Sequence, residues 1–139
     1  MALRMIMDES VGSQLNLVTG CVAGAVKKLE GLGLDEATLF NVKLCLHEAL
    51  VNAVNHGNKS NRDLAVRVVI KADDHEIIIQ VTDQGEGFDF SLIPDPTTEE
   101  NIGKFHGRGI FLIQSTMDSV RFLDGGRTIS MVKTFNKGM

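Results

Sequence analysis

The chain has 139 residues, a length that fits one domain and allows a buried core without a disulfide or a metal. Hydrophobic residues make up 43% of it and the net charge is −4, which is typical of a globular protein and argues against a basic nucleic-acid-binding surface. No apolar run is long enough to span a membrane, and no signal peptide is recognisable. We therefore expect a cytoplasmic protein without nucleic-acid or membrane partners, in which Cys21 and Cys45 are reduced and buried.

The N-terminal part of the chain predicts one strand and then a helix. Residues 3–7 are mostly apolar and predict a short strand. Ser10 or Ser13 is a candidate N-cap for the helix that follows, and Gly33 is placed to end it. Between them, apolar residues at steps of three and four form the stripe of an amphipathic helix: Leu15, Val18, Val22, Val26, Leu29 and Leu32.

A second helix and two strands follow. Asp35 is a good N-cap and Gly57 a natural end for this helix, whose apolar stripe is Leu39, Val42, Leu46, Ala49 and Ala53. Residues 64–71 and 76–82 are rich in valine and isoleucine, which predicts two strands joined by a turn. Residues 83–107 then carry both prolines and many polar residues. A loop of this length in a compact domain is usually functional.

The C-terminal part predicts a helix and a hairpin. Residues 109–117 predict a short helix, and residues 120–123 and 128–135 predict two strands that turn at residues 124–126. This order of elements indicates an α+β fold. We expect a single domain over residues 1–139, built as a two-layer sandwich with its helices on one face of a mostly antiparallel sheet.

Polar residues form a separate stripe on the second predicted helix. At about 100° per residue, Asn41, Cys45, Glu48, Asn52 and Asn55 fall on one narrow stripe. Glu48 and Asn52 lie one turn apart, so a carboxylate and an amide oxygen could hold a hydrated Mg²⁺ or orient a nucleophile. Taken alone, the stripe is better interpreted as a solvated helix face.

Two glycine-containing segments are further candidates for a site. Residues 83–87, with the sequence DQGEG, end a predicted strand. Glycines there allow close approach of a flat ligand, and the carboxylate of Asp83 can accept a hydrogen bond from an exocyclic amine. Residues 107–109, with the sequence GRG, open the last helix, where backbone N–H groups and an arginine favour phosphate. Taken alone, each segment is also typical of an ordinary strand-ending turn or a flexible helix start.

Together and in this order, the three motifs resemble a known family. E-x-x-x-N on a helix, D-x-G-x-G after a strand and G-R-G before a helix match the N, G1 and G2 boxes of the Bergerat-fold (GHKL) ATPases. The segments EALVNAVNHGN, VTDQGEGFD and GRGIFLI look like the small anti-sigma-factor serine/threonine kinase branch, and the resemblance covers nearly the whole chain. It implies the Bergerat ATP-binding fold, ATP and Mg²⁺ as cofactors, and a lid at about residues 88–106.

The resemblance also implies residue roles. Asn52 would coordinate Mg²⁺ at the phosphates, Glu48 would act as the general base, and Asp83 would bind the amino group of adenine. The other implied nucleotide contacts are Gly85 and Gly87 beside adenine, Gly107, Arg108 and Gly109 at the phosphates, and Thr128 in the closing strand.

The activity that the resemblance implies is that of a homodimeric serine/threonine protein kinase. It would phosphorylate a small anti-sigma antagonist protein and sequester a sigma factor. The alternative is a non-catalytic module that binds ATP and holds partners, and the presence of Glu48 favours the enzyme because only catalysis needs a base. The ATPase half of a histidine kinase is disfavoured, because the sequence shows no dimerising helical hairpin with a phospho-acceptor histidine.

Overall fold

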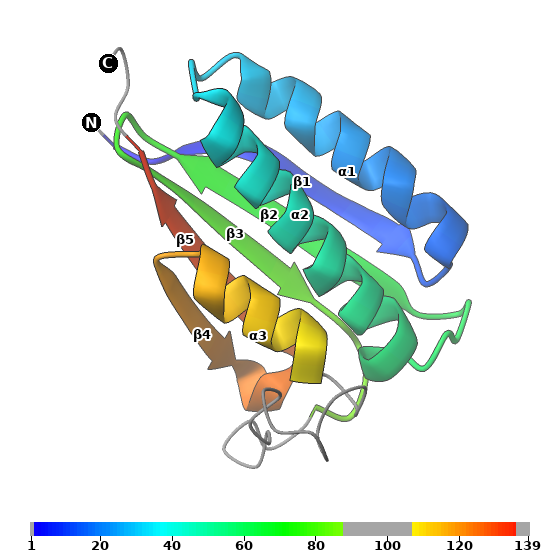
Figure 1. Cartoon of the computed structure of the whole chain (residues 1–139). Coiled ribbons are helices and arrows are strands. Elements are labelled where there is room, and N and C mark those ends of the chain that lie inside the picture. The colour runs from blue at the N-terminus through cyan, green and yellow to red at the C-terminus, as the bar shows by residue number, and fades with distance from the viewer. Residues whose placement is uncertain (1, 88–106, 136–139) are drawn as a thin grey trace.

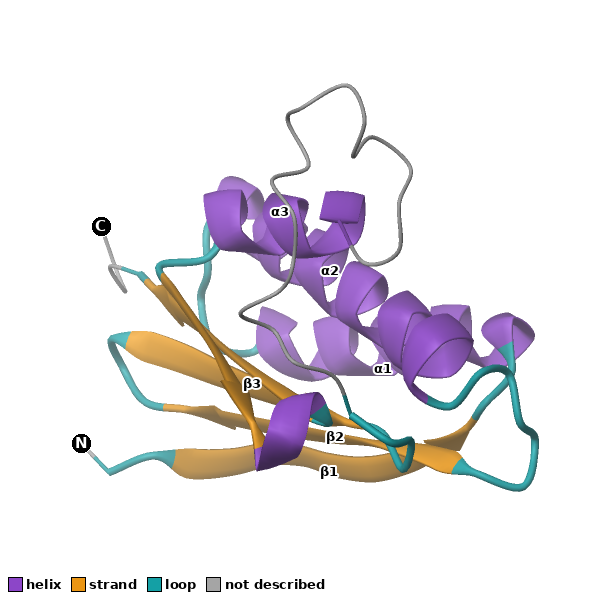
Figure 2. Ribbon diagram, turned by 90° about the horizontal axis from the view of Figure 1, so that it is seen from below, coloured by secondary structure: helices purple, strands orange, loops and turns teal. Residues whose placement is uncertain are grey.

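The chain folds into two layers, with helices on one face of a sheet. A computed structural model describes residues 2–87 and 107–135. Figure 1 shows helices α1 (Leu15–Glu30), α2 (Glu36–Asn52) and α3 (Gly107–Thr116) lying across the sheet, and Figure 2 shows all three on the same side of it. The expected α+β sandwich is confirmed. The expected lid lies outside the described residues. Within the described residues, no helix is long and apolar enough to cross a membrane.

The sheet has five strands in the order β1-β2-β3-β5-β4, and every neighbouring pair is antiparallel. The strands are β1 (Arg4–Gly12), β2 (Ala65–Ala72), β3 (Glu76–Thr82), β4 (Ser119–Leu123) and β5 (Thr128–Thr134). β4 and β5 form the predicted hairpin, joined by a short helical turn, η4 (Asp124–Gly126). β3 is the middle strand, so the segment that follows it begins near the middle of the sheet, at the end where β3 finishes.

Helix α2 crosses the middle of the sheet and has clear sequence signals at both ends (Figure 1). Its N-cap is Asp35 as predicted, since Oδ1 of this residue accepts the Thr38 N–H at 2.8 Å. After Asn52 the chain continues in a wider π-helical turn, η1 (Ala53–Gly57), which ends at the predicted glycine. Such turns are frequent at functional sites, and this one follows Asn52 directly.

The core lies between the helices and the covered face of the sheet. Alternate residues of β2 and β3 point into it, and so do the apolar stripes of α1 and α2. Both cysteines are buried and free, as predicted. Because Cys45 is fully buried, the polar stripe of α2 on which it falls is not solvated along its whole length.

The N-terminal region differs from the prediction in three ways. β1 extends well beyond residues 3–7, because it pairs with β2 from Arg4 to Gly12, with one irregularity between Met5 and Met7. Neither predicted serine caps α1: Ser10 lies in β1, and the Ser13 hydroxyl donates to the Leu64 carbonyl at 2.9 Å. Leu15, the first residue of the predicted stripe, is 51% exposed, so the buried face of α1 begins one turn later at Val18.

Candidate functional site

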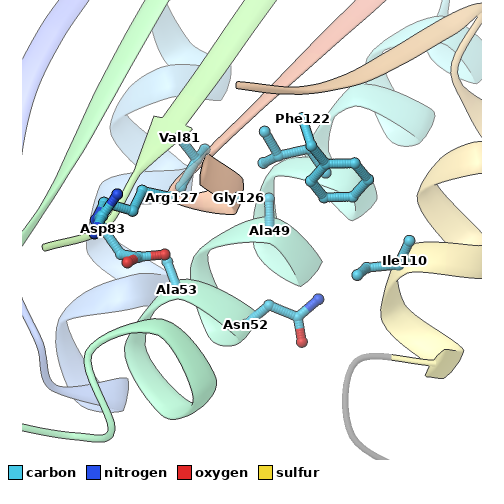
Figure 3. A pocket seen from close by; sticks show the side chains of 10 residues that line it. Ala49, Asn52, Ala53, Val81, Asp83, Ile110, Phe122, Gly126 and Arg127 are labelled. Carbon is cyan, nitrogen blue, oxygen red and sulfur yellow. The ribbon is translucent and has the colours of Figure 1, made fainter. Parts of the chain in front are cut away.

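A cleft lies between α2, α3 and the ends of β3 and β5 (Figure 3). Its walls are mostly apolar and come from six elements: Ala49 of α2, Ala53 of η1, Val81 of β3, Ile110 of α3, Phe122 of β4 and Ile129 of β5. Two polar side chains, the amide of Asn52 and the carboxyl group of Asp83, reach into it from different elements. A mostly apolar cleft with a few placed polar groups is the usual form of a small-molecule site.

The Asp83 carboxyl group is buried at one end of the cleft. Its Oδ1 accepts the Gly85 N–H at 2.8 Å, and the Asp83 N–H donates to the Arg127 carbonyl at 2.9 Å. Its Oδ2 has no hydrogen-bond donor within the described residues, so it can accept one from a ligand. Burial raises the pKa of Asp83 above its usual value, although the Gly85 N–H and the charge of Arg127 act in the opposite direction.

Two glycines allow η1 and the turn after β3 to pack closely. A Cβ on Gly57 would collide with the Asp83 carboxyl group, and a Cβ on Gly85 would collide with the Gly57 carbonyl group. The backbone and the carboxylate approach each other this closely only because both positions lack a side chain. The position of Asp83 in the cleft therefore depends on both glycines.

Replacing Gly85 with alanine is expected to lower the free energy of unfolding by about 2 kcal/mol or more, because the new Cβ must push η1 and the Asp83 turn apart. Gly24→Ala in α1 is the matched control. A Cβ on Gly24 meets nothing within 4 Å, so alanine should stabilise the helix by about 0.5–1 kcal/mol. Urea unfolding of both variants measures the difference, and equal stabilities would contradict the close packing.

Glu48, Asn52 and the start of α3 lie together at the other end of the site. A Cβ on Gly109 would lie 2.8 Å from Asn52 Nδ2 and 3.2 Å from Glu48 Oε2. Both α2 side chains thus pack against the first turn of α3, where backbone N–H groups carry a partial positive charge. Two of the sequence motifs, far apart along the chain, therefore lie side by side in the structure.

This arrangement agrees with the comparison to known families. Residues 13–133 match the family model described as the histidine kinase-like ATPase domain. The chain belongs to the histidine kinase-like ATPase family.

Staphylococcal serine kinases are among the relatives of this ATPase-family chain. It is 37% identical over 103 residues to the serine-protein kinase RsbW of Staphylococcus epidermidis, a match that covers 68% of this chain and 65% of the relative. It is 34% identical over 105 residues to the RsbW of Staphylococcus aureus strain JH9, over 70% of this chain and 66% of the relative. The chain thus spans just under two thirds of the length of these relatives.

A solved structure supports the fold of the ATPase family independently. The structure of the RsbU and RsbW domains of a Mycobacterium tuberculosis protein superposes with a TM-score of 0.59 and 16% sequence identity. The match covers 94% of this chain and 32% of that one.

The remaining glycines of the ATPase motifs lie near the cleft. Gly87 has a φ of 79° and packs against the Gly125 carbonyl group in η4, where a Cβ would collide. Gly107 is the first residue of α3. The side chain of Arg108 lies outside the described residues, so a contact of this arginine with phosphate stays a prediction.

Thr128, the predicted adenine contact in the closing strand, does not line the cleft, so this contact stays a prediction. Its hydroxyl lies 2.8 Å from the hydroxyl of Thr82. Successive side chains of a strand point to opposite faces of the sheet. Ile129 therefore faces the cleft, while Thr128 and Thr82 pair across β5 and β3 on the uncovered face.

Arg127 is a site residue that sequence reasoning missed. Its Nε donates to the Gly85 carbonyl at 2.7 Å, its Nη2 to the Glu86 carbonyl at 3.2 Å, and its Nη1 to the Asp124 carbonyl at 3.2 Å. The guanidinium group thereby ties the turn after β3 to η4. Phe122 was missed as well: the alternating apolar pattern of β4 indicates that it faces inward, but not that β4 borders the cleft.

The donor set fits a nucleotide with a phosphate-bound metal. Mg²⁺ in such sites is held by one or two protein oxygens together with phosphates and water, and the amide oxygen of Asn52 can supply one of them. Within residues 2–87 and 107–135, no group of three or more histidine, cysteine, aspartate or glutamate side chains is placed to hold a metal alone. The apolar walls and the available Asp83 Oδ2 suit a flat heterocycle that bears an amino group.

Proposed function

We propose that this chain binds ATP in the cleft and transfers the γ-phosphate to a serine or threonine of a protein partner. The observation that carries the proposal is the placement of Glu48 and Asn52 against Gly109, at the opposite end of the site from Asp83. Phosphoryl transfer depends mainly on positioning and on neutralising charge at the phosphates. The proposed site offers an amino-group acceptor at one end and a base beside a helix N-terminus at the other.

The proposed roles follow from these positions. Asp83 Oδ2 would accept the amino group of adenine between the apolar walls. Asn52 would hold Mg²⁺, which supplies charge neutralisation at the phosphates when bound. The backbone of residues 107–109 would donate to phosphate oxygens. Glu48 would orient the attacking hydroxyl and receive its proton.

The proposed partners come from the family resemblance of the three motifs. We propose that the substrate is a small anti-sigma antagonist protein and that the chain also sequesters a sigma factor as a homodimer in the cytoplasm. The similarity to proteins named serine-protein kinase RsbW supports the choice of a hydroxyl amino acid as the phosphate acceptor. The two cysteines, which are free and buried, agree with a reducing compartment.

Asp83→Asn is expected to weaken ATP binding by about 1.5–3 kcal/mol, since the hydrogen bond to adenine would lose its charged acceptor. The raised pKa means that the native chain holds the Asp83 proton more tightly than the unfolded chain does. Above that pKa, the ionised carboxylate therefore lowers the free energy of unfolding, and the amide variant should be at least as stable as the unchanged chain. Calorimetry with ATP and thermal unfolding measure the two quantities.

The same pKa shift predicts a pH dependence of binding. ATP affinity of the unchanged chain should fall as the pH drops through the raised pKa of Asp83, starting at a higher pH than an ordinary aspartate would require. The asparagine variant should lack this titration. An identical pH profile of ATP affinity in both proteins would exclude Asp83 as the acceptor.

The proposed kinase activity is tested by capture and labelling. The tagged chain is used to capture proteins from its native cell with Mg-ATP present, and the captured proteins are incubated with γ-labelled ATP. The proposal predicts label on serine or threonine of a small captured protein, and no label with Glu48→Gln. Capture that depends on ATP without any labelling would instead indicate the non-catalytic binding module.

A further inference from the structure

We propose that Asn58 is a positioning residue that sets the preference of the site for adenine, an inference that rests on the proposed ATP binding. Asn58 follows η1 directly and is 2% exposed, although its side chain is an amide. A polar side chain buried to this degree is strongly constrained by its hydrogen bonds. Those bonds join the helix that carries Asn52 to the turn that carries Asp83.

The side-chain amide of Asn58 makes three hydrogen bonds, two through Nδ2 and one through Oδ1. Nδ2 donates to Ser13 Oγ at 2.7 Å and to the Ala65 carbonyl at 3.0 Å, and Oδ1 accepts the Gln84 N–H at 2.7 Å. Ser13 Oγ donates its own proton to the Leu64 carbonyl, so it can only accept from Asn58. The orientation of the amide is therefore fixed, with its oxygen toward the turn after β3.

The bond from the Gln84 N–H reaches the backbone between Asp83 and Gly85. Gln84 is also held from the other side, because its Oε1 accepts the Ala65 N–H at 2.6 Å. The Asp83 N–H and Oδ1 are bonded to Arg127 and Gly85, but neither of these contacts links the turn to α2. Asn58 provides that link, since its own N–H donates to the Ala53 carbonyl in η1 at 2.8 Å.

The consequence for a ligand follows from where Asp83 Oδ2 lies. An oxygen acceptor at a fixed place favours the 6-amino group of adenine and disfavours the 6-oxo group of guanine, which offers no donor there. If the turn shifts relative to α2, this discrimination weakens before the apolar contacts are lost. Asn58 would thus control the choice of base without touching the nucleotide.

The test compares the affinities of ATP and GTP for three proteins by calorimetry: the unchanged chain, Asn58→Ala and Ser13→Ala. Ser13→Ala is the matched control, because it removes an anchor of the same network on the far side from Gln84. We expect Asn58→Ala to reduce the ratio of ATP to GTP affinity by about tenfold or more, while Ser13→Ala lowers thermal stability and keeps the ratio. A ratio unchanged in Asn58→Ala, or reduced equally in both variants, would overturn the inference.

A second measurement uses the unchanged chain and therefore does not require the Asn58→Ala variant to fold. In the unchanged chain, hydrogen exchange should show the Gln84 amide strongly protected, although its side chain is exposed. Exchange of this amide at the rate of a solvated loop would overturn the inference. If the unchanged chain binds neither ATP nor GTP, the proposed function fails, whereas binding of ATP together with an unaffected ratio in Asn58→Ala removes only the role of Asn58.

Discussion

Glu48→Ala is expected to leave ATP affinity nearly unchanged and to slow phosphotransfer by a factor of about 10²–10⁴. The side chain of Glu48 is 30% exposed and lies beside the first turn of α3, but it does not line the apolar cleft that would hold the base. Its loss should therefore remove a proton acceptor and little binding surface. Single-turnover transfer of labelled phosphate to the captured partner measures the rate, and calorimetry measures the affinity.

Glu48→Gln is the matched control for this experiment. It keeps the size of the side chain and its packing against Gly109, and removes the ability to accept the hydroxyl proton. Both variants should be equally slow if Glu48 is the base. Transfer at the unchanged rate in both variants would show that the base lies elsewhere. Transfer that is slow in Glu48→Ala but unchanged in Glu48→Gln would show that the Glu48 side chain acts through packing and not as the base.

Asn52→Ala is expected to abolish Mg-ATP binding or to weaken it by about 100-fold or more. The Asn52 side chain lines the cleft and packs against the first turn of α3, and a binding group for a phosphate-bound metal contributes several kcal/mol to affinity when the site is partly desolvated. Calorimetry with and without Mg²⁺ measures the effect. Asn52→Ala should lower the affinity for ATP more when Mg²⁺ is present than when it is absent.

Asn41→Ala serves as the control for Asn52→Ala. It removes the same kind of side chain from the same helix, near its start and away from the lining of the cleft. Its ATP affinity should equal that of the unchanged chain. Unchanged affinity in Asn52→Ala would refute the assignment of the metal to this residue.

The elements of this fold could be predicted where local sequence decides the structure. Asp35 at a helix start and the apolar stripe of α2 act within one turn, and valine-rich segments such as residues 64–71 form strands with little help from elsewhere. The N-terminus of α1 could not be predicted this way. Ser13 has the chemistry of an N-cap, but its hydroxyl is bound to Leu64, which lies 51 residues away in the sequence.

The candidate site was predictable to the extent that its residues sit in motifs. Glu48, Asn52 and Gly109 were expected to meet, and the structure brings them together. Arg127 was not predictable, because its role depends on η4 lying against the turn after β3. The sequence also did not show that Ile129 and not Thr128 lines the cleft, because neighbouring residues of a strand point to opposite faces of the sheet.

Methyl NMR of labelled isoleucines tests most directly whether the nucleotide occupies the cleft between Asp83 and Asn52. Ile110 and Ile129 line the cleft from α3 and β5, whereas Ile77 lies at the far end of β3 and is fully buried in the core. Addition of Mg-ATP should shift the methyl signals of Ile110 and Ile129 in a saturable manner and leave that of Ile77 in place. Saturable binding that leaves both cleft isoleucines unshifted would contradict the account.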